Sequence, residues 1–465
     1  MILPKPLSVE LPYQDPVALF SPFAESPGAI LLESARQSAD AGRYSYIALE
    51  PFKVMRAKDG AVTLNGVLSE ADPWRILQQE LSRYPIEPLS HLPPLQGGAV
   101  GYFGYDLARH LEQLPDDTVD DQGFPDLLLG FYDVILSFDH VLKKAWIVST
   151  GLPEVEPTAR QRRAQQRLLQ WQQYFSVLPE LQCPTTVGCE PGAIASNFDR
   201  ESYQVAVGDV IKAILAGDIF EANIAQRFTT ILPDNLPTFD LYRRLRACNA
   251  APFASYLNFG DTVIASASPE RFLQLTQRQV ETRPIKGTAP RHPDAAIDQQ
   301  NAQALMQSDK DRAENIMIVD LMRNDLSRVC EDHTVQVPQL CGLESFATVH
   351  HLVSVVKATL RPEYDAIDLL RATFPGGSIT GAPKIRAMEI IETIEPHRRG
   401  PYCGSIGFIS FTGDMDTSIT IRTFVIKNQH VSFHVGGAVV VDSDPAQEYQ
   451  ETLDKAAAMF AALVG

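Results

Sequence analysis

The sequence predicts an α+β fold built mainly on antiparallel sheets, and three observations lead to this expectation. Strand-like segments come in runs and do not alternate strictly with helices, which disfavours a doubly wound parallel sheet. Hydrophobic residues make up 45% of the 465 residues and charged residues 21%, as in a globular chain. No apolar segment approaches the roughly 18 residues that span a bilayer, so we expect no membrane partner.

The first 180 residues are expected to form short strands and turns followed by one helix. Strand-like composition is found at 97–103, 131–138 and 144–150. A charged, glutamine-rich stretch at about 155–175 predicts the helix, and the Pro- and Gly-containing run 183–192 behind it is the best candidate for a boundary. We therefore divide the chain into an N-terminal region, 1–180, and a second region, 195–465.

The second region has clearer periodic patterns. Apolar residues from Tyr203 to Ile214 recur at helical spacing, and Gly217 marks the end of that helix. Helices are also expected at about 310–328, after Pro383, and to about 463 from Asp444, which would be an N-cap followed by proline. Phe220, Ala222 and Ile224 alternate with Glu221 and Asn223, which predicts a half-buried strand. Other strand-like runs lie at 253–259, 262–267, 271–276, 279–284, 404–411, 418–426 and 431–441.

Composition excludes several classes of partner and site. Asp and Glu number 57 against 40 Lys and Arg, a formal net charge of −17, which argues against binding to duplex nucleic acid and to anionic membranes. Residues 1–16 contain four prolines and no continuous apolar core, so we expect no secretory signal. The six cysteines match no zinc-binding spacing and are expected to be reduced thiols of a cytoplasmic protein.

Two pairs of acidic residues have the spacing of a shared helix face. Asp311 and Glu314 are three residues apart on one expected helix, and Glu448 and Glu451 are three apart on another. If the two faces meet, they could hold Mg²⁺, which prefers oxygen ligands. Alternatively, the acids only offset the helix dipoles and face water. Spacing alone leaves both interpretations open.

Other segments carry groups suited to acid–base or nucleophilic chemistry. Lys286 lies at a strand end beside Gly287, where desolvation could remove its proton and make the amine a nucleophile. Glu270 is a candidate general acid or base. The loop 375–384 could present backbone N–H groups to an anion, for example a carboxylate. Ordinary surface charges and a capped turn are the alternatives.

A third group of residues suggests binding of an anion. Arg422 lies in an apolar strand pattern, where its guanidinium needs either a ligand carboxylate or an internal Asp or Glu. Gly436 and Gly437 on the next strand would let a ligand approach the backbone. His350 and His351 could bind a metal or transfer protons, or they could be buried, hydrogen-bonded imidazoles.

Taken together, these segments resemble the chorismate-utilising enzymes, which include component I of anthranilate synthase, component I of aminodeoxychorismate synthase, and the isochorismate and salicylate synthases. The motifs occur in the family's order at 268–272, 283–288, 313–325, 351–354, 377–388, 400–404, 421–423 and 448–451, with weaker matches at 31–34 and 97–103. The resemblance implies an anthranilate synthase component I-like fold. In that fold, two large, mostly antiparallel β-sheets pack as a sandwich with helices outside, and the N-terminal region is interleaved with the rest.

The resemblance also implies roles for individual residues. The metal residues would be Glu314 and Glu451, which would bind Mg²⁺, with Asp311 and Glu448 nearby or bridging through water. The ring of the substrate would lie against Gly287, Thr288 and Gly381, close to His351. The enolpyruvyl side and its carboxylate would be bound by Tyr402, Arg422, Gly436, Gly437, Ala438 and Lys455. A tryptophan pocket would comprise Ser34, Arg43, Tyr44, Pro252, Phe253 and Ala254.

Lys286 distinguishes the branches of the family. Anthranilate synthases typically carry alanine here, whereas lysine resembles the aminodeoxychorismate synthases. In that branch the lysine amine adds to ring C2 as the C4 hydroxyl leaves, and ammonia then displaces the lysine. Glu270 would protonate the leaving hydroxyl. The isochorismate branch carries a lysine base on the strand that reads 221–227 here, and this strand has no lysine.

The resemblance therefore implies a Mg²⁺-dependent enzyme that makes 4-amino-4-deoxychorismate for 4-aminobenzoate and folate biosynthesis. Because the chain has no fused glutaminase, a separate glutamine amidotransferase would form a heterodimer with it and supply ammonia. The alternatives are anthranilate synthase component I, or a non-catalytic subunit that binds chorismate or an amino acid.

Overall fold

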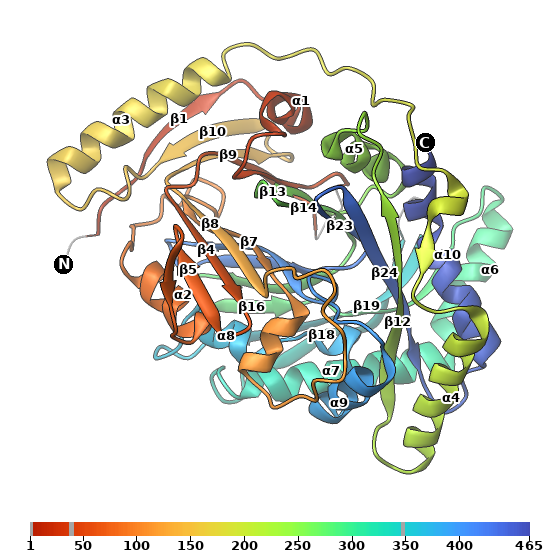
Figure 1. Cartoon of the computed structure of the whole chain (residues 1–465). Coiled ribbons are helices and arrows are strands. Elements are labelled where there is room, and N and C mark those ends of the chain that lie inside the picture. Colours follow the sequence, from red (N-terminus) through yellow and green to blue (C-terminus); the bar gives the residue numbers. More distant parts are fainter. Residues whose placement is uncertain (1–2, 37–40, 346–348) are drawn as a thin grey trace.

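The strands form two large antiparallel sheets, with helices around them (Figure 1). The structure is a computed structural model, and it describes residues 3–36, 41–345 and 349–465. Within these ranges each sheet holds twelve strands. The expected α+β sandwich is confirmed.

The first sheet combines strands from the N-terminal region with strands from the second region. Its strands, in spatial order, are β1 (Leu7–Leu11), β10 (Lys144–Ser149), β9 (Val134–Asp139), β3 (Tyr44–Ala48), β2 (Ala29–Glu33), β13 (Phe253–Asn258), β14 (Thr262–Ser268), β23 (Thr423–Lys427), β24 (His430–Val439), β12 (Glu221–Ile231) and β11 (Ala195–Ser196), while β20 (Gly381–Ala382) also pairs with β12. The two regions join at β2 and β13, where Leu31 lies opposite Tyr256.

The second sheet is also shared between the regions. Its strands, in spatial order, are β17 (Ile285–Pro290), β19 (Val349–Thr359), β16 (Gln279–Thr282), β15 (Arg271–Thr276), β22 (Met415–Ile419), β21 (Ser405–Ser410), β7 (Gly98–Phe103), β8 (Leu127–Tyr132), β4 (Lys53–Lys58), β5 (Ala61–Leu64) and β6 (Val67–Ser69), while β18 (Gln336–Ser345) pairs with β19. Here the regions join at β7 and β21, where Gly101 lies opposite Gly407.

The helices lie around the sheets, as Figure 1 shows. They are α1 (Pro16–Phe20), α2 (Pro73–Ser82), α3 (Pro157–Tyr174), α4 (Arg200–Leu215), α5 (Thr238–Cys248), α6 (Ala295–Gln307), α7 (Asp309–Ser327), α8 (Ala366–Thr373), α9 (Lys384–Ile394) and α10 (Pro445–Val464), with 3₁₀ turns η1 (Ser21–Phe23), η2 (Tyr105–His110), η3 (Pro191–Ala193) and η4 (Gly377–Ile379). The expected N-cap of α10 is confirmed, because the Asp444 side chain accepts hydrogen bonds from the amides of Ala446 and Gln447.

Apolar side chains from the two sheets meet in a shared core. Ile30 and Ile264 of the first sheet belong to the same buried cluster as Val100, Leu128 and Phe408 of the second. Such interdigitation of inward-facing side chains is how face-to-face sheets pack. All six cysteines are free thiols. Among the described helices, none combines the length and the apolar character needed to cross a membrane.

Two expected strands are in fact pairs of strands in different sheets. The run 131–138 breaks at Asp133, because β8 belongs to the second sheet and β9 to the first. The run 418–426 breaks likewise between β22 and β23, and Arg422 at this crossover has a φ of 53°. An apolar run in the sequence does not reveal that the chain changes sheets, because both halves are equally buried.

Candidate active site

Lys286 lies inside the molecule and links the two sheets. Its side chain on β17 is only 8% exposed, and its Nζ donates a hydrogen bond of 2.6 Å to Oε1 of Glu221. Glu221 is the first residue of β12 and its side chain is fully buried. The expected alternation is wrong at the start of this strand, because Phe220 is 70% exposed whereas Glu221, expected on the polar face, is buried together with Ala222. No motif or spacing in the sequence indicates that Glu221 is a functional residue.

The expectation that desolvation removes the proton of Lys286 is wrong for this state of the protein. Burial alone lowers the pKa of Lys286, but the negative charge of Glu221 opposes it, helped at longer range by Glu314 and Glu270. The net effect raises the pKa above its ordinary value. Lys286 is therefore an ammonium here, and a nucleophilic role requires a group that takes its proton.

Glu270 lies where the chain passes from β14 in the first sheet to β15 in the second. Burial raises the pKa of Glu270 to about 7, although a hydrogen bond from Ser378, the amide of Ile285 and the charge of Lys286 all oppose this. The carboxyl is thus present in both protonation states near neutral pH, which suits a general acid or base. Ser378 was missed by the sequence analysis, although it lies within the expected anion-binding loop.

His351 is held as a neutral imidazole next to β17. Its Nδ1 lies 2.9 Å from the hydroxyl of Thr288, with which it also pairs across the sheet. Burial lowers the pKa of His351 to about 4, against a hydrogen bond to the backbone of Gly287, and the nearby charge of Arg422 lowers it further. His351, Thr288, Gly287 and Arg422 are therefore brought into one region.

His350 has a structural role. Its Nδ1 lies 2.8 Å from Oγ of Ser345, and its Nε2 lies 3.1 Å from Oδ1 of Asp298. Of the two alternatives left open by the sequence, the structure shows the buried, hydrogen-bonded imidazole at this position.

The acid pairs of α7 and α10 face a common space. Lys310 of α7 lies 3.5 Å from Glu448 of α10. Burial lowers the pKa of Lys310, but Glu448, Glu314 and Glu451 outweigh this effect and raise it. The ammonium of Lys310 therefore interacts electrostatically with carboxylates of both helices, as expected if the two acidic faces meet.

Glycines on two strands allow the backbone to approach these acids. A Cβ atom added at Gly437 would lie 3.0 Å from Oε2 of Glu448 and 3.6 Å from Oε1 of Glu451. At Gly287, where φ is +83°, a Cβ would lie 2.9 Å from Oδ1 of Asp311. Larger side chains at either position would occupy the space beside the carboxylates.

The carboxylate oxygens of this region fit Mg²⁺, although the described acidic side chains are not arranged as a complete coordination site. Among the described residues, no group of three or more His, Cys, Asp or Glu side chains is gathered so that it could hold an ion. However, Oε1 of Glu314 and Oε2 of Glu448 are buried without a hydrogen-bond partner in the described part of the chain. Burial also raises the pKa of Glu314 to about 7. Such orphaned oxygens are costly unless a cation satisfies them, and carboxylates are ligands that Mg²⁺ prefers.

Arg422 provides positive charge close to His351. Burial lowers the pKa of its guanidinium, and within the described ranges no Asp or Glu is among the groups that shift it. This observation favours a ligand anion over an internal carboxylate. The electrostatic interaction with Tyr402 raises the pKa of the Arg422 guanidinium and so partly opposes the effect of burial. Tyr402 is buried, and its ring stacks on His434 with ring centroids 4.9 Å apart.

Lys455 is already engaged within the protein. It donates to the carbonyl of Gly436 at 2.9 Å and forms an ion pair of 2.6 Å with Glu451. It therefore connects α10 to β24 and sets the position of one of the expected metal ligands.

Small residues let three strands run close together beside Glu221. Gly381 of β20 lies opposite Ala222, and a Cβ atom there would lie only 2.1 Å from the carbonyl oxygen of Glu221. On the other side of β12, Ala438 and Gly436 of β24 lie opposite Asn223 and Ala225. Gly381 is thus required for the close approach of the backbones at this point.

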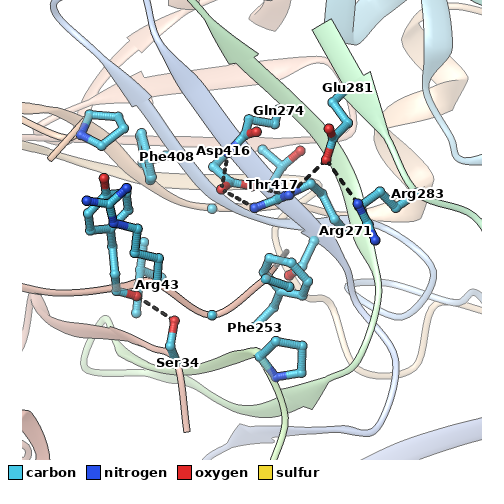
Figure 2. Close-up of a pocket in the computed structure, with 18 of the residues that line it drawn as sticks. Ser34, Arg43, Phe253, Arg271, Gln274, Glu281, Arg283, Phe408, Asp416 and Thr417 are labelled. Atoms are coloured by element: carbon cyan, nitrogen blue, oxygen red, sulfur yellow. Dashed lines mark hydrogen bonds and ion pairs between the residues drawn. The ribbon is translucent and has the colours of Figure 1, made fainter. Parts of the chain in front are cut away.

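A separate cavity of about 490 Å³ lies between the sheets. All six residues of the expected tryptophan pocket line it: Ser34, Arg43, Tyr44, Pro252, Phe253 and Ala254. Figure 2 shows Arg271 in ion pairs with Asp416 and Glu281 on one wall, and Phe253 and Phe408 facing the same hollow. The cavity combines apolar rings with paired charges, which suits an amino acid that has an apolar side chain. The sequence motifs do not indicate this charged wall, because its members lie on separate strands.

Comparison with known proteins assigns nearly the full length of the chain to one family. A family model described as a chorismate binding enzyme matches residues 28–461. Aminodeoxychorismate synthase component 1 of Klebsiella aerogenes is 41% identical over 457 residues, which cover 97% of each protein. Anthranilate synthase component 1 of Thermus thermophilus is 39% identical over 455 residues, covering 97% of this chain and 95% of that protein.

A solved structure agrees with these sequence relationships. The crystal structure of anthranilate synthase component I from Streptococcus pneumoniae TIGR4 is similar with a TM-score of 0.79 and 33% sequence identity. The match covers 91% of this chain and 93% of that chain. The sandwich and its helices are therefore arranged as in a solved member of the group.

Proposed function

The chain belongs to the chorismate-binding enzyme family, and from that premise we propose that it is aminodeoxychorismate synthase component 1. It would convert chorismate and ammonia to 4-amino-4-deoxychorismate in the cytoplasm, for 4-aminobenzoate and folate biosynthesis. The observation that carries this proposal is the buried Lys286, whose ammonium lies among Glu221, Glu270 and Glu314. A buried amine so placed is a suitable covalent nucleophile once it loses its proton.

The proposed reaction has two displacements. In the first, the Lys286 amine forms a bond to ring C2, the two conjugated ring double bonds each shift by one position, and the C4–O bond breaks. The leaving oxygen takes a proton from Glu270 and departs as water. In the second, ammonia forms a bond to C4, both ring double bonds shift back, and the C2–N bond to Lys286 breaks. The added nitrogen then gives its extra proton to the Glu270 carboxylate, which restores the acid.

Other residues would bind and orient the substrate. Arg422 would pair with the carboxylate of the enolpyruvyl group, beside Tyr402 and the backbone of Gly436, Gly437 and Ala438. Gly287, Thr288, Gly381 and His351 would line the ring. Lys455 would act through Glu451 and Gly436, which it already contacts.

Mg²⁺ would be held by Glu314 and Glu451, with Glu448 and Asp311 beside them. When bound, it would supply positive charge that neutralises the ring carboxylate of chorismate. Ammonia would come from a separate glutamine amidotransferase. The names of the similar proteins support a partner, since they are each called component 1.

The second candidate is anthranilate synthase component 1, because a relative of that name is 39% identical. Lys286 favours the first candidate, since a buried amine at this position has a covalent role only in the amination at C4. A non-catalytic subunit that binds chorismate or an amino acid is the third candidate. The buried acids and Arg422 argue against it, because a binding protein has no need of a carboxyl whose pKa is close to 7.

The test is to incubate the protein with chorismate, Mg²⁺ and an ammonium salt. We expect 4-amino-4-deoxychorismate, and we expect Lys286→Ala to abolish it. Without ammonia, intact mass measurement should show a covalent adduct that is absent from Lys286→Ala. Lys53→Ala is a matched control, because Lys53 is also paired with a buried glutamate, Glu80, but lies elsewhere. Anthranilate and pyruvate as products would establish the second candidate, and binding of chorismate without turnover the third.

We also propose that the cavity between the sheets binds tryptophan, with the indole against Phe253. Titration calorimetry should detect binding to the wild type, and Phe253→Ala should weaken it about tenfold or more, through loss of a buried aromatic contact. Equal affinity in the two proteins would contradict this site.

A further inference from the structure

Glu221 is the carboxylate in direct contact with the amine of Lys286. Its Oε1 lies 2.6 Å from Nζ, and its side chain is fully buried. Its other oxygen, Oε2, is also buried and has no hydrogen-bond partner in the part of the chain that the structure describes. The carboxylate is therefore stabilised chiefly by one ammonium, and a proton transferred between them has only a short distance to travel.

The backbone around Glu221 holds this side chain in place. The amide of Phe220 donates to the carbonyl of Ala382 at 2.7 Å, and Gly381 lies so close that no Cβ fits between the strands. β24 pairs along the other edge of β12. The start of β12 is thus fixed on both sides, so the contact with Lys286 follows from sheet pairing and not from a flexible loop.

The other nearby carboxyl groups are less suited to accept this proton. Glu270 accepts a hydrogen bond from the amide of Ile285. In the proposed reaction it must carry a proton for the leaving hydroxyl, so it cannot take one in the same step. Glu314 acts on Lys286 only at longer range and belongs to the proposed metal site.

We propose that Glu221 accepts the proton of Lys286 as the amine attacks, an inference that rests on the proposed function. The ammonium gives one proton to Oε1 of Glu221, and the freed electron pair forms the N–C2 bond while Glu270 protonates the leaving oxygen. After ammonia expels Lys286 as a neutral amine, Glu221 returns the proton. Converting a buried ion pair to a neutral pair also removes two charges from an environment of low dielectric constant.

The experiment compares Glu221→Gln with the wild type in single turnovers without ammonia, followed by intact mass. Glutamine keeps the shape and a hydrogen-bond acceptor but cannot take a proton. We expect adduct formation and kcat to fall about 10²- to 10⁴-fold, as for loss of a general base, while KM for chorismate changes little. Glu221→Asp should recover part of the rate, because a carboxylate remains. Glu80→Gln is the matched control, since Glu80 is a buried glutamate paired with Lys53.

If Glu221 served only as a structural counter-ion of Lys286, Glu221→Gln would not slow adduct formation. Removing its charge would lower the pKa of Lys286, free the amine and leave adduct formation unchanged or faster. That result would overturn the inference while the proposed function stands. If Glu221→Gln does not fold, Glu221→Asp decides, because a slower adduct supports the inference and a wild-type rate overturns it. If the wild type itself forms neither adduct nor 4-amino-4-deoxychorismate, the proposed function fails first.

Discussion

The properties of single residues in this site follow from how burial and neighbouring charge balance. Burial raises the pKa of both Glu270 and Glu314 to about 7. At Lys286 the same desolvation is outweighed by Glu221, so the ammonium persists. Chemical function at this site therefore depends on which group is paired and which is not, since all three side chains are largely shielded from water.

The first prediction concerns Glu270→Gln. The pKa of Glu270 is raised from its ordinary value of 4.5 to about 7, so the folded state holds this proton more tightly than the unfolded state. Stability is therefore lost as pH rises between these values, by up to about 3 kcal/mol. Glutamine removes this loss, so Tm should rise at pH 8 more than at pH 5, while kcat falls at least about 10²-fold. Thermal melts at both pH values test it, and lower stability than the wild type at pH 8 would contradict it.

The second prediction is a pH profile. The first displacement requires protonated Glu270, whose pKa is about 7. The rate of adduct formation without ammonia should therefore decline as pH rises through about 7. Rapid-quench mass measurements from pH 6 to 9 test this expectation. A rate that only increases over this range would show that another group donates the proton.

At the scale of elements, the site is built where the chain changes sheets and where helices begin. Glu270 lies at the crossover from β14 to β15, and Arg422 lies at the crossover from β22 to β23. The two crossovers are hydrogen-bonded to each other, since Ile419 donates to the carbonyl of Glu270 and Ala267 to that of Arg422. The general acid and the anion-binding guanidinium are therefore positioned by the same backbone contacts.

The third prediction concerns the start of α10. Asp444→Ala removes the cap from the turn that carries Glu448, so it should cost about 1 kcal/mol and weaken Mg²⁺ binding. Urea unfolding and Mg²⁺ titration measure the two effects. Glu156→Ala is the matched control, because Glu156 caps α3 through the amides of Thr158 and Ala159. This control variant should lose similar stability and keep its Mg²⁺ affinity. An equal loss of Mg²⁺ affinity in both variants would show that the effect of Asp444→Ala does not act through the position of Glu448.

At the scale of the whole molecule, each of the two sheets is built from strands of both regions. β2 needs β13 as its neighbour, and β7 needs β21. The cavity between the sheets is likewise lined by residues of both regions, such as Ser34 and Phe253. A ligand bound there would stabilise the joined structure, because it binds only the folded form.

The fourth prediction is that the two regions fold together. Residues 1–180 alone would leave the edges of β2 and β7 unpaired and their apolar faces uncovered, so this fragment should not form a cooperative structure. Calorimetry of the full chain should show no separate transition for it. Sharp melting of the isolated fragment at the temperature of a transition in the full chain would contradict the prediction.

Several parts of the fold and the site could be predicted because they depend on local pattern. The start of α10 follows from its capping residue, Asp444, and α4 from the helical spacing of its apolar residues. The pairing of the acids on α7 and α10 follows from their three-residue spacing. The crossovers at Asp133 and Arg422 could not be predicted, since an apolar run looks the same whether it stays in one sheet or passes to another.

The sequence by itself determined the classes of elements, the family motifs and the presence of a lysine at position 286. Only the tertiary structure decided that Lys286 meets Glu221, 65 residues earlier in the chain, and that the amine therefore keeps its proton. The physical reason is that desolvation and ion pairing depend on which side chains the packed sheets bring within a few ångströms. Spacing along one helix or strand carries no information about the residue that arrives from the opposite sheet.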